Sequence, residues 1–430
     1  MKSSRMSGGI AGVVLLTIAL TGQAVDPKTA VPSKLWDAPP PPAGFPKFQV
    51  QEIASDFKIG YAVHICDVNG DGKPDIVVVD QARVVWYENP TWKMRTILTG
   101  KTKPDNVCIC SLDIDGDGKL DFVLGAGWKP FDTKTPGTLQ WLRRGKTLDE
   151  EWEMFPIPCD EPTVHRVGVA KLKPDDKHSS IILVPLMGRD ATKEQNWMNG
   201  QGVRIMAYDL PQDPTRSENW MPRVLDNQLH VVHNFATLSL FATDRILTAS
   251  YEGIHELVLS KVPSSASLTH PGSQDTPKGN RGASEIAISD PMKQFMIATV
   301  EPWHGNRIVA YALNFKSPSK IDRVVIDDHL RWGHAIKWGN LTDEKTDMIV
   351  AGVRDNPDPK QGDKFTEKRG VRLYRNTDGK GEKWDRYILE DGGVAVEDLQ
   401  VADLDGDGKP EIIAVGRATG NCRIYWNKGK

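Results

Sequence analysis

Three copies of one nine-residue pattern, D-x-[DN]-x-D-G-x-x-[DE], constrain this chain more than any other feature. The copies begin at Asp67, Asp113 and Asp403, and each runs directly into β-branched and aliphatic residues. Oxygen ligands at alternating positions of a tight loop suit a hard cation such as Ca²⁺, and glycine allows the sharp turn. The twelfth-position carboxylate of an EF-hand is absent, and strand-like segments flank each loop. We therefore expect structural Ca²⁺ held by Asp67, Asn69, Asp71, Asp75, Asp113, Asp115, Asp117, Asp121, Asp403, Asp405, Asp407 and Glu411.

The spacing of these loops predicts the architecture. The 336 residues from Asp67 to Asp403 divide into six intervals of 56, so seven units fit. Each unit reads as an apolar strand, the loop or a degenerate version, a second apolar strand, a third such as Val84 to Tyr87, and a closing strand. Strands at this density with a repeat of this length predict an all-β fold, a seven-bladed β-propeller of four-stranded antiparallel blades.

The two ends of the repeat complete the ring. The last unit stops after its third strand, near Trp426, and lacks a closing strand. Residues 48–53 have the pattern of a closing strand with no unit before them. Placing this N-terminal strand on the last blade removes an exposed sheet edge. We therefore expect the propeller to span residues 47–430.

The N-terminus has the features of a targeting segment. Lys2 and Arg5 precede the apolar stretch from Ile10 to Leu20, and a small-x-small site ends at Ala24. This pattern predicts a signal peptide over residues 1–24 and an exported protein with no membrane span after cleavage, the alternative being an uncleaved anchor. Residues 25–46 are expected to form a proline-rich leader, and residues 263–282, rich in Ser, Pro and Gly, a disordered insertion.

Charge and cysteine content limit the kinds of partner and cross-link that we expect. The net charge is −3, with no cluster of Lys and Arg, so a nucleic-acid partner is not expected. The chain contains five cysteines and no C-x-x-C, which favours buried free thiols over a disulfide framework or a zinc cage.

Candidate functional residues lie on the face of the propeller opposite the aspartate loops. Six residues before the loop starts stand Tyr61, Val107, His165, His334 and Glu397, and Glu285 lies near this position in the fifth unit. The exits of the second strands add further polar residues, among them Arg189. Taken singly, such residues are often structural; their convergence at one channel mouth favours a site. The catalytic candidates are His165, His233, His334, Glu301, His304, Glu397, Arg354 and Arg417.

Two mechanisms suit these residue types. Neutral imidazoles can hold a divalent transition metal or Mg²⁺ that polarises a carbonyl, the candidate ligands being His165, His230, His233 and His334. Alternatively, His acts as a base and Arg stabilises an enediolate-like anion without metal. No G-x-S-x-G, H-E-x-x-H or Rossmann glycine pattern is present, which disfavours serine hydrolases, zincins and dinucleotide enzymes. Trp303 is a candidate for stacking on a sugar ring.

The aspartate loops leading into I-V-V strands resemble the FG-GAP/VCBS repeat family of calcium-loop propellers. A narrower resemblance rests on Glu161-Pro-Thr-Val-His165, His230-Val-Val-His233, Glu301-Pro-Trp-His304, Trp332-Gly-His334, Val396-Glu397 and Val415-Gly-Arg417. These segments look like the propeller domain of aldos-2-ulose dehydratase. That resemblance implies metal-assisted removal of water from an oxidised sugar. The cupin domains of that family, and any isomerisation assigned to them, are not expected here.

Three functions remain open on the sequence alone. The first is an exported carbohydrate-active lyase or dehydratase, a carbon–oxygen lyase that acts on a keto sugar by β-elimination. The second is a non-catalytic propeller that binds a carbohydrate or a protein. The third is a polysaccharide lyase, which the near-neutral charge opposes because an acidic polymer requires a positive groove. The sequence predicts a sugar or oligosaccharide partner in the first case and does not predict the oligomeric state.

Overall fold

The computed structural model describes residues 34–173, 178–239, 244–257, 266–274, 279–293, 295–313, 321–342, 347–354 and 368–430. The expected signal peptide lies outside these residues. The described part consists of β-strands and two short 3-10 helices, η1 (Lys193–Gln195) and η2 (Ser217–Asn219). None of its helices is long and apolar enough to cross a membrane. All five cysteines are free.

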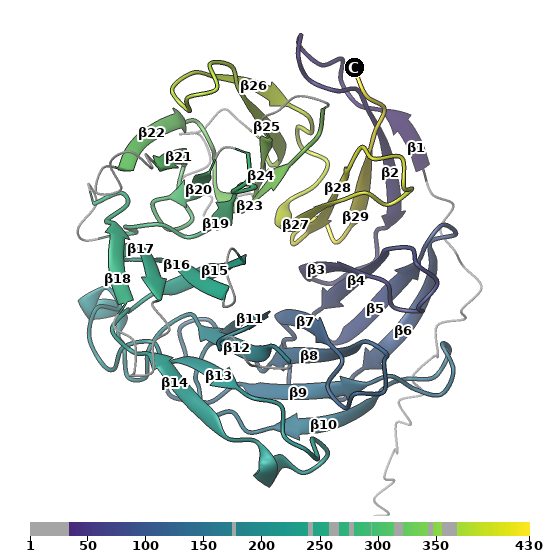
Figure 1. Ribbon diagram of the computed structural model, residues 1–430, viewed down its shortest axis with the longest axis vertical. Coiled ribbons are helices and arrows are strands. Elements are labelled where there is room, and N and C mark those ends of the chain that lie inside the picture. Colours follow the sequence, from purple (N-terminus) through teal and green to yellow (C-terminus); the bar gives the residue numbers. More distant parts are fainter. Residues whose placement is uncertain are drawn as a thin grey trace, which may run out of the picture. The chain divides into compact units, whose positions relative to one another are not determined.

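The strands form seven sheets arranged around a ring, as Figure 1 shows. Blade 1 contains β3 (Gly60–Cys66), β4 (Asp75–Asp80), β5 (Arg83–Glu88) and β6 (Lys93–Thr99). Blade 2 contains β7 (Cys108–Leu112), β8 (Asp121–Ala126), β9 (Thr138–Arg143) and β10 (Glu153–Ile157). Blade 3 contains β11 (Val164–Ala170), β12 (Ser180–Pro185), β13 (Ile205–Tyr208) and β14 (Pro222–Asp226).

The next three blades repeat this order. Blade 4 contains β15 (Val232–Ser239), β16 (Asp244–Ser250), β17 (Gly253–Leu257) and β18 (Ala266–His270). Blade 5 contains β19 (Ile286–Ile288), β20 (Met296–Glu301), β21 (Arg307–Leu313) and β22 (Ile321–Asp327). Blade 6 contains β23 (Gly333–Gly339), β24 (Met348–Val353), β25 (Gly370–Asn376) and β26 (Trp384–Ile388). Neighbouring strands pair antiparallel throughout, and the seven-bladed prediction is confirmed.

Blade 7 joins the two ends of the chain. It contains β27 (Val396–Ala402), β28 (Glu411–Gly416), β29 (Cys422–Asn427), β2 (Phe48–Ala54) and β1 (Lys34–Asp37). Phe48 pairs with Asn427, which confirms the predicted closure by the N-terminal strand. The fifth strand, β1, was not predicted. Trp36 anchors it by packing against the core beneath and by lying 5.0 Å from the Arg423 guanidinium, so this part of the leader is pinned to the blade edge.

Burial follows the position of a strand within its blade. Every residue of β4, β8, β12, β24 and β28 is buried, because a middle strand is covered by the blades on both sides. These strands therefore read as continuous apolar runs in the sequence. Two tryptophans of the third strands, Trp86 and Trp141, are buried in the same way, whereas Trp426 in β29 is half-buried.

The stretch from 263 to 282 differs from the expected disordered insertion over part of its length. Residues 266–270 form β18, which pairs along β17 with Leu257 opposite Ala266. The polar, flexible composition suggested disorder, but the open edge of β17 offers this segment a full set of backbone hydrogen-bond partners. Ser273 also pairs with Gly282. Residues 263–265 and 275–278 lie outside the described part.

Candidate functional site

Local irregularities at the start of the innermost strands build the site. In five blades the pairing of the first strand with the second shifts register by one residue, at Tyr61, His165, His233, His334 and Glu397. A β-bulge of this kind interrupts the alternation of side chains and re-aims the extra residue. The repeated bulge therefore directs one polar side chain per blade toward the same end of the channel, hereafter the histidine end.

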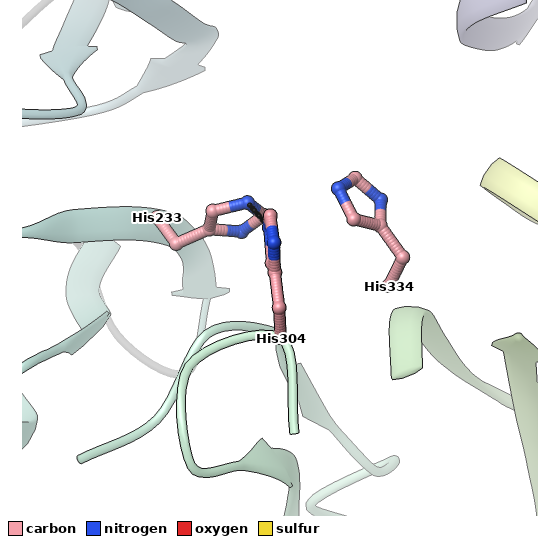
Figure 2. Close-up of side chains that lie close together, drawn as sticks. All are labelled: His233, His304 and His334. Carbon is pink, nitrogen blue, oxygen red and sulfur yellow. Dashed lines mark hydrogen bonds between the residues drawn. The ribbon is translucent and has the colours of Figure 1, made fainter. Parts of the chain in front are cut away.

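Three histidines meet at this end. One ring nitrogen from each of His233, His304 and His334 lies within 4.8 Å of the others, and we call this set the histidine cluster (Figure 2). The Nε2 atoms of His233 and His304 are 2.8 Å apart. His304 comes from the loop between β20 and β21, where its backbone has a positive φ of 49°. A left-handed conformation is uncommon for histidine, and such strain persists where the surroundings impose it.

Neighbouring groups orient each ring. His334 donates from Nδ1 to the carbonyl oxygen of Glu397 at 2.6 Å, and Figure 2 shows its other nitrogen facing the remaining two rings. Nδ1 of His233 lies 2.8 Å from a carboxylate oxygen of Glu285. The ring of Trp303 stacks on His304 with centroids 4.0 Å apart and a 10° angle between planes. His233 and His334 are thus held through the nitrogen away from the cluster, as metal-ligating histidines usually are, and His304 is held through its ring face.

His165 completes the group without joining the three-nitrogen set. Its ring lies 4.6 Å from that of His233 and 4.9 Å from that of Trp128, centroid to centroid. Its Nε2 is 3.1 Å from the guanidinium of Arg166. Burial lowers the pKa of His165, His304 and His334 well below the usual 6.5, with neighbouring positive groups adding to the effect. These imidazoles are therefore neutral at neutral pH.

His233 is the most basic imidazole of the group. Burial lowers its pKa as well, but the carboxylate of Glu285 opposes that shift, and no other histidine of the group has a carboxylate so near. Glu285 itself is buried and also accepts a hydrogen bond from the side chain of Asn234. The pair resembles the carboxylate–imidazole couples that raise the basicity of a ligand or a base.

A carboxylate clamped by two arginines lies beside the cluster. Glu397 accepts hydrogen bonds from Arg354 and from Arg417, the latter at 2.9 Å. Although burial would raise the pKa of Glu397, the two guanidinium charges lower it, so this carboxylate stays ionised. Arg354 also reaches Nδ1 of His304 at 3.5 Å, and Arg417 lies over the ring of Tyr61. Glu397 is therefore a poor proton donor and a good anchor for the arginines.

Two predicted site residues lie elsewhere. His230 points to Glu252, with Nδ1 2.7 Å from its carboxylate, and does not join the histidine cluster. Glu301 is fully buried within blade 5, where Thr299, Tyr311, Arg323 and Ser273 donate to it. Trp303 is also buried against His233, His304 and Tyr251, so it positions imidazoles and its ring is not open for a sugar.

Two residues of the site were not singled out by sequence reasoning. Arg166 and Trp128 contact His165 directly. Glu285, which the sequence placed near the strand-start position of the fifth unit, lies beside His233. Arg166 and Trp128 carry no such signal, because one follows a bulge and the other lies in a loop of the neighbouring blade.

A cavity of about 550 Å³ lies inside the channel, lined by residues that neighbour the site histidines in sequence, such as Arg166 and Asn234. All seven innermost strands contribute to its walls, and Tyr61 and Arg166 belong both to these walls and to the site. Further along the walls, burial lowers the pKa of His64 to about 4, with Lys337 adding to the effect. The cavity has room for a small polar molecule beneath the cluster.

The aspartate loops occupy the other end of the innermost strands. In each loop the first aspartate accepts from two glycine N–H groups, as Asp403 does from Gly406 at 2.8 Å and from Gly408 at 2.9 Å. Those glycines have φ of 76° and 81°. The three oxygens of Asp403, Asp405 and Glu411 lie within 4.8 Å of one another, and those of Asp113, Asp115 and Asp121 do the same. An all-oxygen set of this geometry fits a hard cation such as Ca²⁺.

Comparisons with known proteins agree with this architecture. A family model of FG-GAP-like repeats matches residues 67–124 and 342–414, which contain the aspartate loops, so these segments of the seven-bladed propeller are similar to FG-GAP repeats. A second family model, the β-propeller domain of aldos-2-ulose dehydratase, matches residues 136–314. This second segment includes His165, His233 and His304. The chain is therefore similar to the propeller domain of that dehydratase. No curated protein matches.

Solved structures support the fold. Sqt1 of Saccharomyces cerevisiae has 9% sequence identity and a TM-score of 0.53, with 87% of this chain and 97% of that chain covered. The structure of BBS1N in complex with ARL6DN, soaked with mercury, has 13% identity and a TM-score of 0.51, with 92% and 97% covered. A chain of the mitotic checkpoint complex has 10% identity and a TM-score of 0.51, with 97% and 98% covered. At these identities the similarity shows the fold alone.

Proposed function

We propose that the protein is a carbohydrate-active lyase that removes water from a keto sugar at the histidine end. The observation that carries the proposal is the convergence of His233, His304 and His334 within 4.8 Å, beside His165 and above the channel cavity. Four neutral imidazoles and a buried carboxylate at one mouth exceed what a scaffold requires. The match to the dehydratase propeller over residues 136–314 supports the same chemistry.

The reaction requires a base, a site for a developing oxyanion and a proton for the leaving hydroxyl. A base removes the proton from the carbon beside the ketone, the electron pair forms a C=C bond, and the C–O bond at the next carbon breaks. The hydroxide leaves with one proton as water, so the step needs no oxidant or reductant. His165 stands outside the three-nitrogen set and is free to take the carbon-bound proton and return it to the leaving oxygen. To act through Nε2, His165 must first release the hydrogen bond that this nitrogen accepts from Arg166.

The histidine cluster fits a divalent transition metal. His233, His304 and His334 would hold it, each through the ring nitrogen turned away from its orienting partner. Imidazole donors favour such a metal over Mg²⁺, which prefers oxygen. The ion supplies Lewis-acid polarisation of the sugar carbonyl when bound. Arg354 and Arg417, fixed by Glu397, would orient substrate oxygens at the same mouth.

We further propose Ca²⁺ as the resident ion of the aspartate loops, with a structural role. The loops lie about 20 Å from the histidine end, because six residues of extended strand separate Glu397 from Asp403. We also propose export, on the strength of the N-terminal pattern of Lys2, Arg5 and the apolar stretch before Ala24.

The test combines metal analysis with turnover. Purified protein would be assayed for bound metals by mass spectrometry and incubated with 1,5-anhydrofructose and 3-keto-glycosides, following enone absorbance. We expect a transition metal near one per chain and enone formation that His165→Ala abolishes. If neither substrate class turns over, and wild type and His165→Ala behave alike, the lyase proposal fails.

One observation favours a second candidate, a non-catalytic carbohydrate-binding propeller. Two members of the cluster can satisfy each other through hydrogen bonds from Arg354 to His304 and from His304 to His233, whose Nδ1 lies 2.8 Å from a carboxylate oxygen of Glu285. In those tautomers each ring nitrogen of His304 and His233 has a polar neighbour without ion or substrate. Metal-free protein that binds sugars and never forms enone would support this reading.

A further inference from the structure

Two loops extend the histidine end outward over blades 2 and 3. Residues 127–137 leave β8 and residues 186–204 leave β12, both at strand ends that pair with the start of an innermost strand. The loops are joined, because Asp190 donates its N–H to the carbonyl of Thr133 and the hydroxyl of Thr133 donates to the carbonyl of Ala191 at 2.9 Å. They form one surface beside the candidate site.

This surface presents a stacked aromatic pair, Phe131 and Trp197. The two rings have centroids 5.3 Å apart and an interplanar angle of 19°. Trp197 is partly buried and packs against the core beneath, whereas Phe131 is 55% exposed. Phe131 therefore stacks on Trp197 and remains exposed to solvent, in contrast to Trp303, which is buried.

The backbone holds the pair in a strained conformation. Among the described non-glycine residues, seven have a positive φ, and four of them are Phe131, Asp190, Asn196 and Trp197, with φ of 72°, 63°, 52° and 61°. Thr163 and His304, next to and within the histidine group, are two more. Bulky residues avoid this region unless the surroundings impose it, and such strain gathers at functional sites. Asn196 is fastened by donating to the carbonyl of Gly279 at 3.0 Å.

The charge around the pair is balanced. The two loops carry five basic residues and three acidic ones, and Asp160 and Glu161 neutralise Arg189 and Arg204 through ion pairs. A surface without net charge does not select an acidic polymer. It suits a neutral ligand that offers a flat apolar face, as the C–H face of a pyranose ring does.

We propose that Phe131 and Trp197 form a stacking platform for one pyranose ring of a neutral oligosaccharide whose reacting end lies at the histidine cluster. Trp128 connects the two places, because it is three residues from Phe131 and its ring lies 4.9 Å from His165. The inference deepens the proposed function, on which it rests, by naming the substrate class as a glycan chain or long glycoside. A monosaccharide would leave the platform empty.

Calorimetric titration with cellopentaose, xylopentaose and glucose tests the platform without requiring turnover. We expect a pentasaccharide to bind at least about tenfold more tightly than glucose, and Phe131→Ala and Trp197→Ala each to weaken it by about tenfold. Phe131→Trp retains binding because it keeps a flat ring. Met221→Ala, at a side chain 75% exposed outside both loops, serves as the matched control and binds as wild type does.

The outcomes separate this inference from the proposed function. Pentasaccharide affinity equal to that of glucose, or unchanged in a folded Phe131→Ala protein, overturns the platform even if enone forms from small keto sugars. Platform-dependent binding with no enone from any keto substrate leaves the platform standing and removes the lyase. Circular dichroism of each variant distinguishes lost stacking from lost folding, and Phe131, being exposed, is the safer of the two positions.

Discussion

The two ends of the innermost strands solve the problem of gathering polar groups in opposite ways. At the aspartate end each site is one loop, whose residues lie within nine positions of the sequence and bond to their own backbone. At the histidine end His233, His304 and His334 come from separate strands and loops, and the closest contact, between His233 and His304, spans 71 residues. A site formed by one loop can be present in one blade and absent from the next. The histidine site, by contrast, exists only when the blades have assembled into the ring.

The two ends also differ in solvent and charge. The ligands of the aspartate loops range from exposed in the middle of the loop to half-buried at its first residue and buried at its ninth, and all but Asn69 are anionic. The imidazoles are buried and neutral. Perturbing the aspartate end should therefore change stability with little effect on chemistry, whereas perturbing the histidine end should change the chemistry.

The sharpest test of that division is His233→Ala. Enone formation should fall by about a thousandfold, because the variant loses both an imidazole of the metal set and the partner of Glu285. Steady-state rates measure the effect, and His178→Ala, at an exposed position in the connection between β11 and β12 and therefore at the opposite end of the innermost strand from the histidine cluster, should react as wild type does. Equal rates for the two variants would remove the histidine cluster from the chemistry.

The buried histidines of the histidine end should make the free energy of unfolding depend on pH. The folded pKa of His165, His233, His304 and His334 lies below the unfolded value near 6.5, so the unfolded chain binds more protons as the solution is acidified. Their contribution is complete well above pH 6.5 and is lost below it, by about 5 kcal/mol in total between pH 7.5 and 5.5, or about 1.4 kcal/mol for each group. Urea denaturation in the presence of Ca²⁺ measures it.

The aspartate loops should act in the opposite direction when no ion is bound. Burial raises the pKa of Asp75 and Asp121 to about 6 and that of Glu411 to about 7. A raised folded pKa gives stability that is present at low pH and lost as the pH rises through 6 to 7. As the pH falls, the free energy of unfolding should therefore decrease less steeply in EGTA than in Ca²⁺, because the loops offset part of the loss caused by the histidines. Identical slopes under both conditions would contradict this assignment of the two ends.

Removing Ca²⁺ should lower the free energy of unfolding by about 3 kcal/mol for each occupied loop, or about 8 kcal/mol for all three, relative to a solution holding the ion at one hundred times its dissociation constant. Thermal unfolding with and without EGTA measures the change, and the enone rate at 25 °C should be unaffected. Asp67→Asn, Asp113→Asn and Asp403→Asn combined should abolish the Ca²⁺ response. A variant that keeps the response would place the ion elsewhere.

The smallest effect is expected from Glu285→Gln. The amide keeps the shape but loses the charge that supports the basicity of His233, so kcat should fall by about tenfold and metal affinity should weaken. The acid limb of the pH–rate profile reports the change. A purely structural role would lower the melting temperature and leave that limb where it was.

The sequence predicted the ring, its closure and four of the strand-start residues because the innermost strands have similar lengths. Counting six residues back from a loop start reaches the bulge at Tyr61, His165, His334 and Glu397. Counting residues from a motif does not predict the direction of a side chain in a loop. Glu301 and His304 are three residues apart, yet one is enclosed by Arg323 and Tyr311 within blade 5 and the other faces His233. Contacts between blades, such as Trp128 on His165, follow from the assembled ring and from no local pattern.

The pairing of β2 with β29 sets the order in which the protein can be completed. Phe48 can pair early with the β1 side, where Ala38 donates to its carbonyl, but the opposite edge of β2 must wait for Asn427, 379 residues later. Until then the growing chain has one unpaired edge on β2 and another on the blade made last. During most of its synthesis the ring of blades is therefore incomplete, and its unpaired strand edges can pair with other chains. The ring closes only when β29 pairs with β2. Such dependence on contacts so distant in sequence is typical of slow folding.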